Sequence, residues 1–305
     1  MYFYTMIYLI TAIICGSLFS ILFKVCARSG GDSRLVIFYN YITALAASLF
    51  PIGKGIFIDG TPASSFVLPG WIIGLTLISG LFFMLGFVSL NSSTQKCGVA
   101  LTTVCAKAAL VIPVILCYLF LGEKEPAWGP VAMTFAAMIL IISPSPSAFK
   151  GHSGKDFAAG ALLVFLCYGV SDFMLKLNQH SVRLNAGADQ VLENAGMDSM
   201  MSFIFLFALI ASFAYCLMKG SFKNKENRLK NILFGLGLGL VNLGCTSSMI
   251  RSLASLPSNV FFPIYNTGVV LVGTAAGILF FREKMKWTQV LGLILAVIAV
   301  ILLKR

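Results

Sequence analysis

Lys107 is the residue with the clearest capacity for binding chemistry, because it lies about ten residues inside the apolar stretch Gly98–Leu121. A charge near the centre of a membrane-spanning helix costs at least about 2.5 kcal/mol, so such a residue usually serves a function. An ammonium group at that depth can bind an anionic group such as a carboxylate. The alternative is a lysine whose charge is satisfied by main-chain carbonyls or by a carboxylate of the protein itself.

Three further charged residues lie in or near the ends of two other apolar stretches. Asp172 and Lys176 are four residues apart, so they share a helix face and could form an ion pair. Asp172 could instead take up and release a proton in a water-filled cavity, where protonation and ligand binding compete. Lys24 occupies the position in an earlier stretch that matches Lys176. Either lysine could line a cavity or extend to the lipid head groups, as lysines at helix ends commonly do.

Polar uncharged residues inside apolar stretches point to the same kind of site. Two prolines, Pro113 and Pro263, each free a helix carbonyl that a ligand could use. Thr267 falls where Lys107 would recur at an offset of 160 residues. Most such polar residues only bond neighbouring helices, but together they predict a wet, polar centre. The set comprises Tyr39, Asn40, Asn242, Tyr265, Asn266 and Thr267.

Other apparent motifs favour structural roles. The glycines Gly235, Gly237 and Gly239 lie in an apolar stretch with no preceding strand, so close helix packing explains them better than a nucleotide loop. The eight cysteines form no C-x-x-C pair and are expected to be small buried hydrophobes. Glu123 and Glu283 each stand beside a lysine and are expected to anchor helix ends. We therefore expect no metal and no cofactor.

The amino-acid composition indicates that these residues lie in membrane-spanning helices. Of 305 residues, 58% are hydrophobic and 11% are charged, whereas a soluble domain carries about a quarter charged residues. A membrane crossing takes roughly 20 apolar residues, so the chain has room for about ten. The net charge of +11 is expected to lie in loops that face anionic lipid, and not to bind nucleic acid.

Ten apolar stretches are long enough to be candidate transmembrane helices. They divide into a first five-helix repeat at residues 1–146, a linker at 147–156 that follows the Pro-Ser-Pro-Ser segment, and a second repeat at 157–305. A long connection is expected from Asn178 to Asp198. The stretches are Thr5–Ala27, Leu35–Pro51, Pro69–Leu90, Gly98–Leu121, Trp128–Ile142, Phe157–Lys176, Ser199–Met218, Asn231–Ile250, Asn259–Phe281 and Trp287–Leu303.

The two halves share an internal repeat. An apolar run closes on Glu123-Lys124 before Trp128, and another closes on Glu283-Lys284 before Trp287. Equivalent elements are five helices apart, an odd number, so the halves must have opposite orientations in the membrane. With the proline-containing helix that precedes each Glu-Lys pair, this pattern resembles the paired modules of the EamA family in the drug/metabolite transporter superfamily.

The resemblance implies an all-α polytopic membrane protein with ten transmembrane helices in two inverted-topology repeats. It also implies a secondary active transporter, not an enzyme, that works by alternating access in a bacterial inner membrane, as a monomer or homodimer. The cavity residues favour a small polar metabolite, such as an amino acid or organic acid, with protons as the coupling ion. Open alternatives are a sugar-derivative or drug exporter, a passive channel and an enzyme acting on a lipid-linked substrate.

The sequence supports two alternative orientations of the chain in the membrane. Ten basic residues cluster in odd-numbered connections, which by the positive-inside rule places both termini outside. The family resemblance implies both termini inside. The residues counted are Lys150, Lys155, Lys219, Lys223, Lys225, Arg228, Lys230, Arg282, Lys284 and Lys286.

Overall fold

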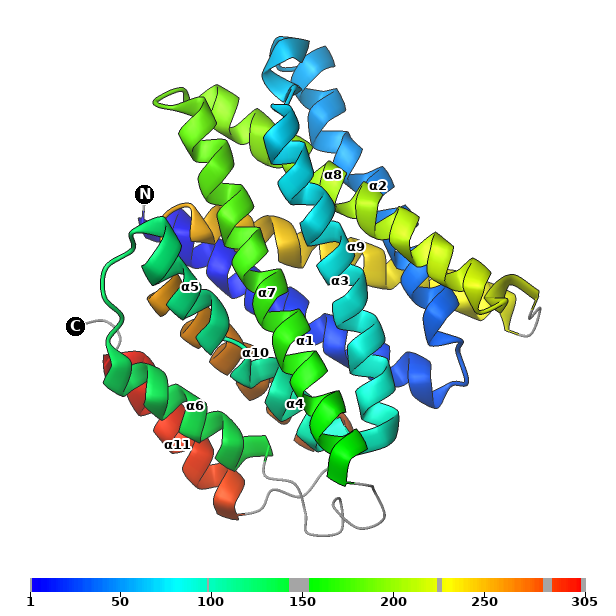
Figure 1. Cartoon of the computed structure of the whole chain (residues 1–305), viewed down its shortest axis with the longest axis vertical. Helices are drawn as coiled ribbons and strands as arrows, with labels where there is room; N and C mark the ends of the chain where they lie inside the picture. The colour runs from blue at the N-terminus through cyan, green and yellow to red at the C-terminus, as the bar shows by residue number, and fades with distance from the viewer. Residues whose placement is uncertain (1, 98, 143–153, 224–226, 282–286, 303–305) are drawn as a thin grey trace. The chain divides into compact units, whose positions relative to one another are not determined.

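The structure is a computed structural model that describes residues 2–97, 99–142, 154–223, 227–281 and 287–302. Within these ranges every regular element is helical (Figure 1). The α-helices are α1 (Tyr2–Arg28), α2 (Ser33–Phe57), α3 (Gly70–Cys97), α4 (Val99–Ala108), α5 (Val111–Leu121), α6 (Trp128–Ile142), α7 (Gly154–Ala186), α8 (Gln190–Met218), α9 (Arg228–Leu253), α10 (Ser258–Phe281) and α11 (Trp287–Leu302). Two short 3₁₀ helices, η1 (Ala63–Phe66) and η3 (Ser221–Lys223), lie in connections.

Among the described residues, seven helices are long and apolar enough to cross a membrane. They are α1, α2, α3, α7, α8, α9 and α10, and shorter apolar helical segments lie at Cys105–Leu121, which spans parts of α4 and α5, at Trp128–Leu140 and at Val290–Ala299. The expected all-α, multi-pass membrane protein is confirmed at this level. Ten crossings arranged as inverted repeats stay a prediction.

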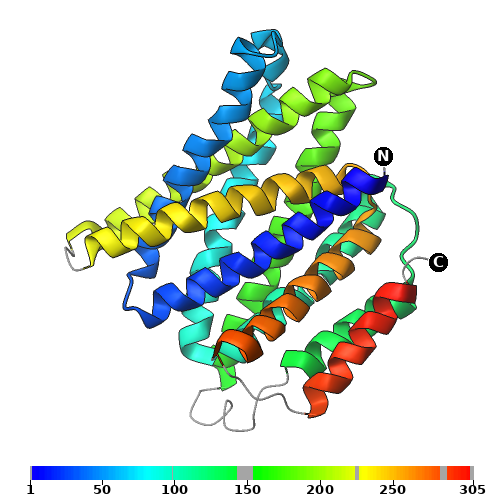
Figure 2. The ribbon, with the colours of Figure 1, turned by 180° about the vertical axis from the view of Figure 1, so that it is seen from behind.

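The chain forms two compact units. The first unit comprises Met1–Met84 and Met174–Ala254, and the second comprises Leu85–Phe173 and Ser255–Arg305. In the first unit, α9 packs along α1 and α2, and α8 also packs along α2 (Figure 2). In the second unit, α6 lies beside α11, and α10 contacts α5 and α6 (Figure 1). The division between the units runs through α3 and α7.

The expected single helix over Gly98–Leu121 is interrupted, and this is a correction. Helix α4 ends at Ala108 and α5 begins at Val111. Pro113 has no N–H and cannot complete the helical bond to the Ala109 carbonyl. Ile112 N donates to that carbonyl instead, at 3.0 Å, and Leu110 N donates to the carbonyl of Lys107. Both hydrogen bonds join residues that are three apart instead of four. They end α4 at Ala108, one residue after Lys107, before α5 begins.

The long connection expected from Asn178 to Asp198 is wrong. Helix α7 continues to Ala186 and α8 begins at Gln190, so the connection is Gly187–Asp189. Gly187 adopts a left-handed conformation with φ of 61°, which glycine tolerates and which ends helices. The Asp189 side chain then accepts hydrogen bonds from the N–H groups of Val191 and Leu192, so it caps the next helix.

Glycines allow close helix packing in the first unit, as the sequence predicts. Gly235 and Gly239 on α9 face the backbone of α2 around Asn40, whereas a Cβ at Gly237 would meet nothing within 4 Å, so the prediction is wrong for Gly237. On α3, a Cβ added at Gly80 would lie 2.7 Å from the Ile204 carbonyl oxygen and 2.8 Å from Ala208 N on α8. Backbone atoms of a neighbouring helix cannot yield as a flexible side chain can, so only glycine fits at this position.

Replacing Gly80 with alanine is therefore expected to destabilise the protein by about 1–3 kcal/mol, the usual cost of overpacking. Gly74→Ala is the matched control, because Gly74 is on the same helix and a Cβ there meets nothing within 4 Å. Thermal unfolding of the purified protein in detergent would measure both. Equal unfolding temperatures for the two variants would contradict the close approach of α3 to α8.

Candidate functional site

Lys107 is surrounded by groups from two other helices of the second unit. Its Nζ donates to Asn266 Oδ1 on α10 at 3.3 Å and lies 5.7 Å from the centre of the Tyr265 ring. Its charge also interacts electrostatically with Asp172 on α7. An amide oxygen and an aromatic face thus contact one ammonium group, a carboxylate interacts with it electrostatically, and this arrangement stabilises its charge.

Helix α10 holds its two polar groups in defined positions. Asn266 Nδ2 donates to the Phe262 carbonyl at 3.1 Å, which leaves the amide oxygen to accept from Lys107. The Tyr265 ring is stacked on Phe261, with 5.6 Å between ring centres and an interplanar angle of 7°. The site for the ammonium group is therefore set by α10.

Asp172 reaches the same cluster because α7 packs closely on α5. Gly169 lies one turn before Asp172 and directly faces the Ile112 side chain, where a Cβ would clash. Phe173 contacts Phe120 of α5, with 6.4 Å between ring centres. Asp172 is partly buried. These contacts hold the helix that carries Asp172 against α5, the helix that follows Lys107 in the chain.

The remaining predicted residue of the second unit is Thr267, which is 2% exposed. Its Oγ1 has no hydrogen-bond partner among the described residues. A buried hydroxyl without a partner is costly, so Thr267 can supply a polar contact to a bound molecule or water. The structure thus brings Lys107, Asp172, Tyr265 and Asn266 together and leaves Thr267 next to them in the sequence.

The other predicted residues lie in the first unit. Asn242 Nδ2 donates to Asn40 Oδ1 at 3.3 Å. Asn40 is 2% exposed, and its own Nδ2 has no partner within the described residues. Tyr39 packs over Gly235. These residues connect α2 to α9, the ordinary role of such groups between membrane helices, with one amide donor left for a ligand or water. Their part in binding stays a prediction.

Lys176 is buried and donates to the Leu253 carbonyl at 2.7 Å. Leu253 is the last residue of α9, so the lysine caps a helix C-terminus, where a positive charge is stabilising. Arg183, also on α7, donates to the next carbonyl, Ala254 O, at 2.9 Å. The side chain of Lys24 lies outside the described part of the chain. The role of both lysines in coupling stays a prediction.

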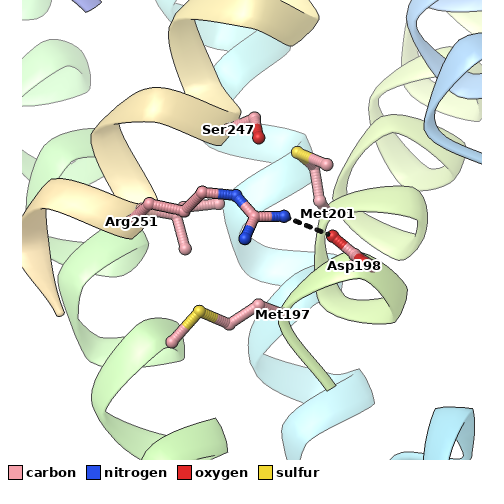
Figure 3. A pocket seen from close by; sticks show the side chains of 6 residues that line it. Met197, Asp198, Met201, Ser247 and Arg251 are labelled. Atoms are coloured by element: carbon pink, nitrogen blue, oxygen red, sulfur yellow. Dashed lines mark hydrogen bonds and ion pairs between the residues drawn. The ribbon is translucent and has the colours of Figure 1, made fainter. Parts of the chain in front are cut away.

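A charged pair that the sequence did not single out lies in the first unit. Arg251 donates to Asp198 Oδ1 at 3.1 Å, joining α9 to α8 (Figure 3). The Tyr8 ring of α1 lies 5.9 Å from the guanidinium carbon. The pair borders a cavity of about 10 Å³, which is room for about one water molecule, together with Met197, Met201 and Ser247 (Figure 3). It therefore ties three helices together.

Glu123 anchors a helix end, as the sequence predicts. Its carboxylate accepts from Ser258 N at 2.8 Å and from Ser258 Oγ at 3.2 Å. Ser258 is the first residue of α10, so the carboxylate neutralises the positive end of this helix. Helix α10 carries Tyr265 and Asn266, so Glu123 helps to place the groups around Lys107. The equivalent Glu283 lies outside the described residues.

Replacing Glu123 with glutamine is expected to destabilise the protein by about 1 kcal/mol, because the charge at the helix N-terminus is lost while an acceptor remains. Glu125→Gln is the control, because Glu125 is exposed and belongs to the same connection. Thermal unfolding in detergent would compare them. If Glu123→Gln and Glu125→Gln unfold alike, the capping contact contributes nothing measurable.

A set of metal ligands is not part of this site. No group of three or more His, Cys, Asp or Glu side chains that could hold a metal ion occurs among the described residues. The chemistry of the site is that of one ammonium group, one carboxylate and neutral polar groups.

Comparison with known proteins shows similarities in sequence and in fold. An uncharacterized protein of Haemophilus influenzae is 25% identical over 303 residues, covering 96% of this chain and 95% of its own. A protein of known crystal structure shares the fold, with a TM-score of 0.71 and 15% identity over 97% of this chain and 94% of that chain. Residues 185–305 match the model of the EamA-like transporter family. Over these residues the match agrees with the family resemblance, and together with the seven candidate membrane helices it indicates an integral multi-pass membrane protein.

Proposed function

We propose that this protein is a secondary active transporter for a small anionic metabolite of the amino-acid or organic-acid class. The observation that carries the proposal is the cluster around Lys107, a positive charge in an apolar helix that contacts Asn266 and Tyr265 and interacts electrostatically with Asp172. Intramembrane charges of this kind mark substrate and ion pathways.

The interrupted helix supports an anion site. Substrate sites of many transporters are built at breaks in membrane helices, where half-helix ends carry partial charge. Helix α5 begins at Val111, so the positive end of its dipole lies four residues along the chain from Lys107. The negative end of α4 lies at the same break, so the ammonium group of Lys107 is the feature that favours a negative group there.

Asp172 supports coupling to protons. While Asp172 is ionised, it neutralises Lys107 and repels an incoming carboxylate. Protonation of Asp172 removes both effects, so a proton and an anionic substrate bind cooperatively. Binding that is linked in this way lets a proton gradient drive the uptake of the substrate. Alternating access by two inverted five-helix repeats, residues 1–146 and 157–305, would then carry both across the membrane.

Counterflow in liposomes tests this function. The purified protein would be reconstituted and screened with labelled amino acids, organic acids and sugars, with and without a pH gradient. We expect counterflow of anionic solutes and accumulation when the outside is acidic. Counterflow of neutral sugars alone would overturn the anion site, and downhill leakage without counterflow would identify a channel.

A further inference from the structure

An apolar groove lies between α2 and α8 in the first unit. Its volume is about 310 Å³, and it is lined by Phe38, Ile42, Leu209, Ile210 and Phe213. Ile42 is 38% exposed and Ile210 55% exposed. Both helices are long and apolar enough to cross a membrane, so the groove opens on a surface that lipid chains cover. No polar group of its lining can bind water or a polar ligand.

The aromatic ring of Phe222, in η3, packs against two residues that line the groove. Phe222 contacts Phe38 with 5.3 Å between ring centres and Phe213 with 5.7 Å. Cys216 Sγ donates to the Arg34 carbonyl at 3.4 Å, so the end of α8 is fixed against the start of α2. The residues that follow α8 therefore lie directly beside one end of the groove.

That end is strongly basic. Its described residues, 29–38, 216–223 and 227–231, carry five basic side chains and one acidic side chain. The acid is Asp32, which accepts from Arg34 Nε at 3.2 Å. Lys230 donates to the Ser29 carbonyl, and Lys219 and Lys223 are exposed. The five basic residues are Arg34, Lys219, Lys223, Arg228 and Lys230.

We propose that an anionic phospholipid binds here, with an acyl chain in the groove and its phosphate at Lys219 and Lys223. An apolar groove that ends in a basic cluster complements a molecule with an apolar chain and an anionic head. Basic pockets at the ends of membrane helices bind such head groups. A second copy of the chain fits poorly, because a two-fold contact would bring two identical basic clusters together.

The head-group contact is tested by lipid binding to the purified protein, measured by native mass spectrometry in neutral detergent. Phosphatidylglycerol is expected to bind more tightly than phosphatidylcholine with the same acyl chains. The double variant Lys219→Gln/Lys223→Gln should bind phosphatidylglycerol about 30-fold more weakly, because each lost charge costs about 1 kcal/mol of binding free energy. The matched control is Lys54→Gln/Lys124→Gln. Lys54 is on the same helix as Arg34 but about 30 Å further along it.

The role of the groove in binding an acyl chain is tested by filling the groove with a larger side chain. Ile42→Trp should reduce the binding of phosphatidylglycerol at least about tenfold, since loss of two buried methylene groups already gives such a change. Leu49→Trp is the control, because Leu49 is 51% exposed on the same helix and outside the groove. Equal binding of the two lipids, or equal binding by a variant and its control, would overturn the proposal.

Two further measurements identify the bound molecule. Soluble glycerol phosphate should not compete, and competition at millimolar concentration would show a site for free anions instead. A dimer whose formation Ile42→Trp abolishes would show that a second copy covers the groove. Both results would overturn the lipid site. None of these measurements depends on substrate transport, so the lipid site and the proposed function can fail independently.

Discussion

Replacing Lys107 with methionine is expected to lower kcat/KM for an anionic substrate by roughly 30- to 1000-fold. Removing one of two interacting charges costs about 2–5 kcal/mol when both are buried. Because Lys107 and Asp172 are partly buried, we expect about 2–4 kcal/mol, which corresponds to this range. Methionine keeps the length of the side chain and removes its charge. Initial rates of uptake into liposomes, measured over a range of substrate concentrations, would give the value.

Controls separate this effect from a loss of structure. Lys124→Met removes an exposed lysine outside the cluster and should transport normally. Lys107→Arg keeps the positive charge with a different geometry, so it should retain more activity than methionine. Folding would be checked by thermal unfolding. A folded Lys107→Met protein with unchanged transport would show that the ammonium group only balances Asp172 and does not bind substrate.

The membrane fold and the central lysine could be predicted because both depend on local composition. A single charge in an apolar run is visible in the sequence, and so is a series of apolar runs. The partner of Asp172 could not be predicted in this way. Spacing along the helix suggested Lys176, whereas Lys176 donates to the end of α9 and Lys107 acts on Asp172 from another helix. Only tertiary packing creates that pair.

Two helix boundaries predicted from the sequence are wrong because a charged residue was taken to lie beyond the end of the helix. Asp198 and Arg251 were placed outside apolar stretches, so neither was considered as an intramembrane group. Gly187 ends α7 and Asp189 caps α8, and these two residues carry the signal that could have placed Asp198 inside a helix. A proline in an apolar stretch does not by itself predict a helix break. Pro263 lies inside the continuous helix α10, whereas Pro113 follows the break at Ala109–Leu110. The tertiary packing of each helix decides which outcome a proline has.

Replacing Asp172 with asparagine is expected to abolish proton-driven accumulation while counterflow continues. The amide is neutral at every pH, as the protonated carboxyl is, so the variant stays in the state that accepts an anion. In the wild-type protein, raising the pH ionises Asp172 and weakens substrate binding. In the variant, the KM for an anionic substrate should therefore be nearly independent of pH.

The measurement is uptake by liposomes with an imposed pH gradient, together with counterflow at several pH values. Asp198→Asn is the matched control, because Asp198 is also within a membrane helix but pairs with Arg251. It should keep the dependence on protons. Proton-driven accumulation that survives in Asp172→Asn would remove this residue as the coupling site. Loss of counterflow as well, in a folded protein, would assign Asp172 to substrate binding, because a residue that only carries the proton is not needed for exchange.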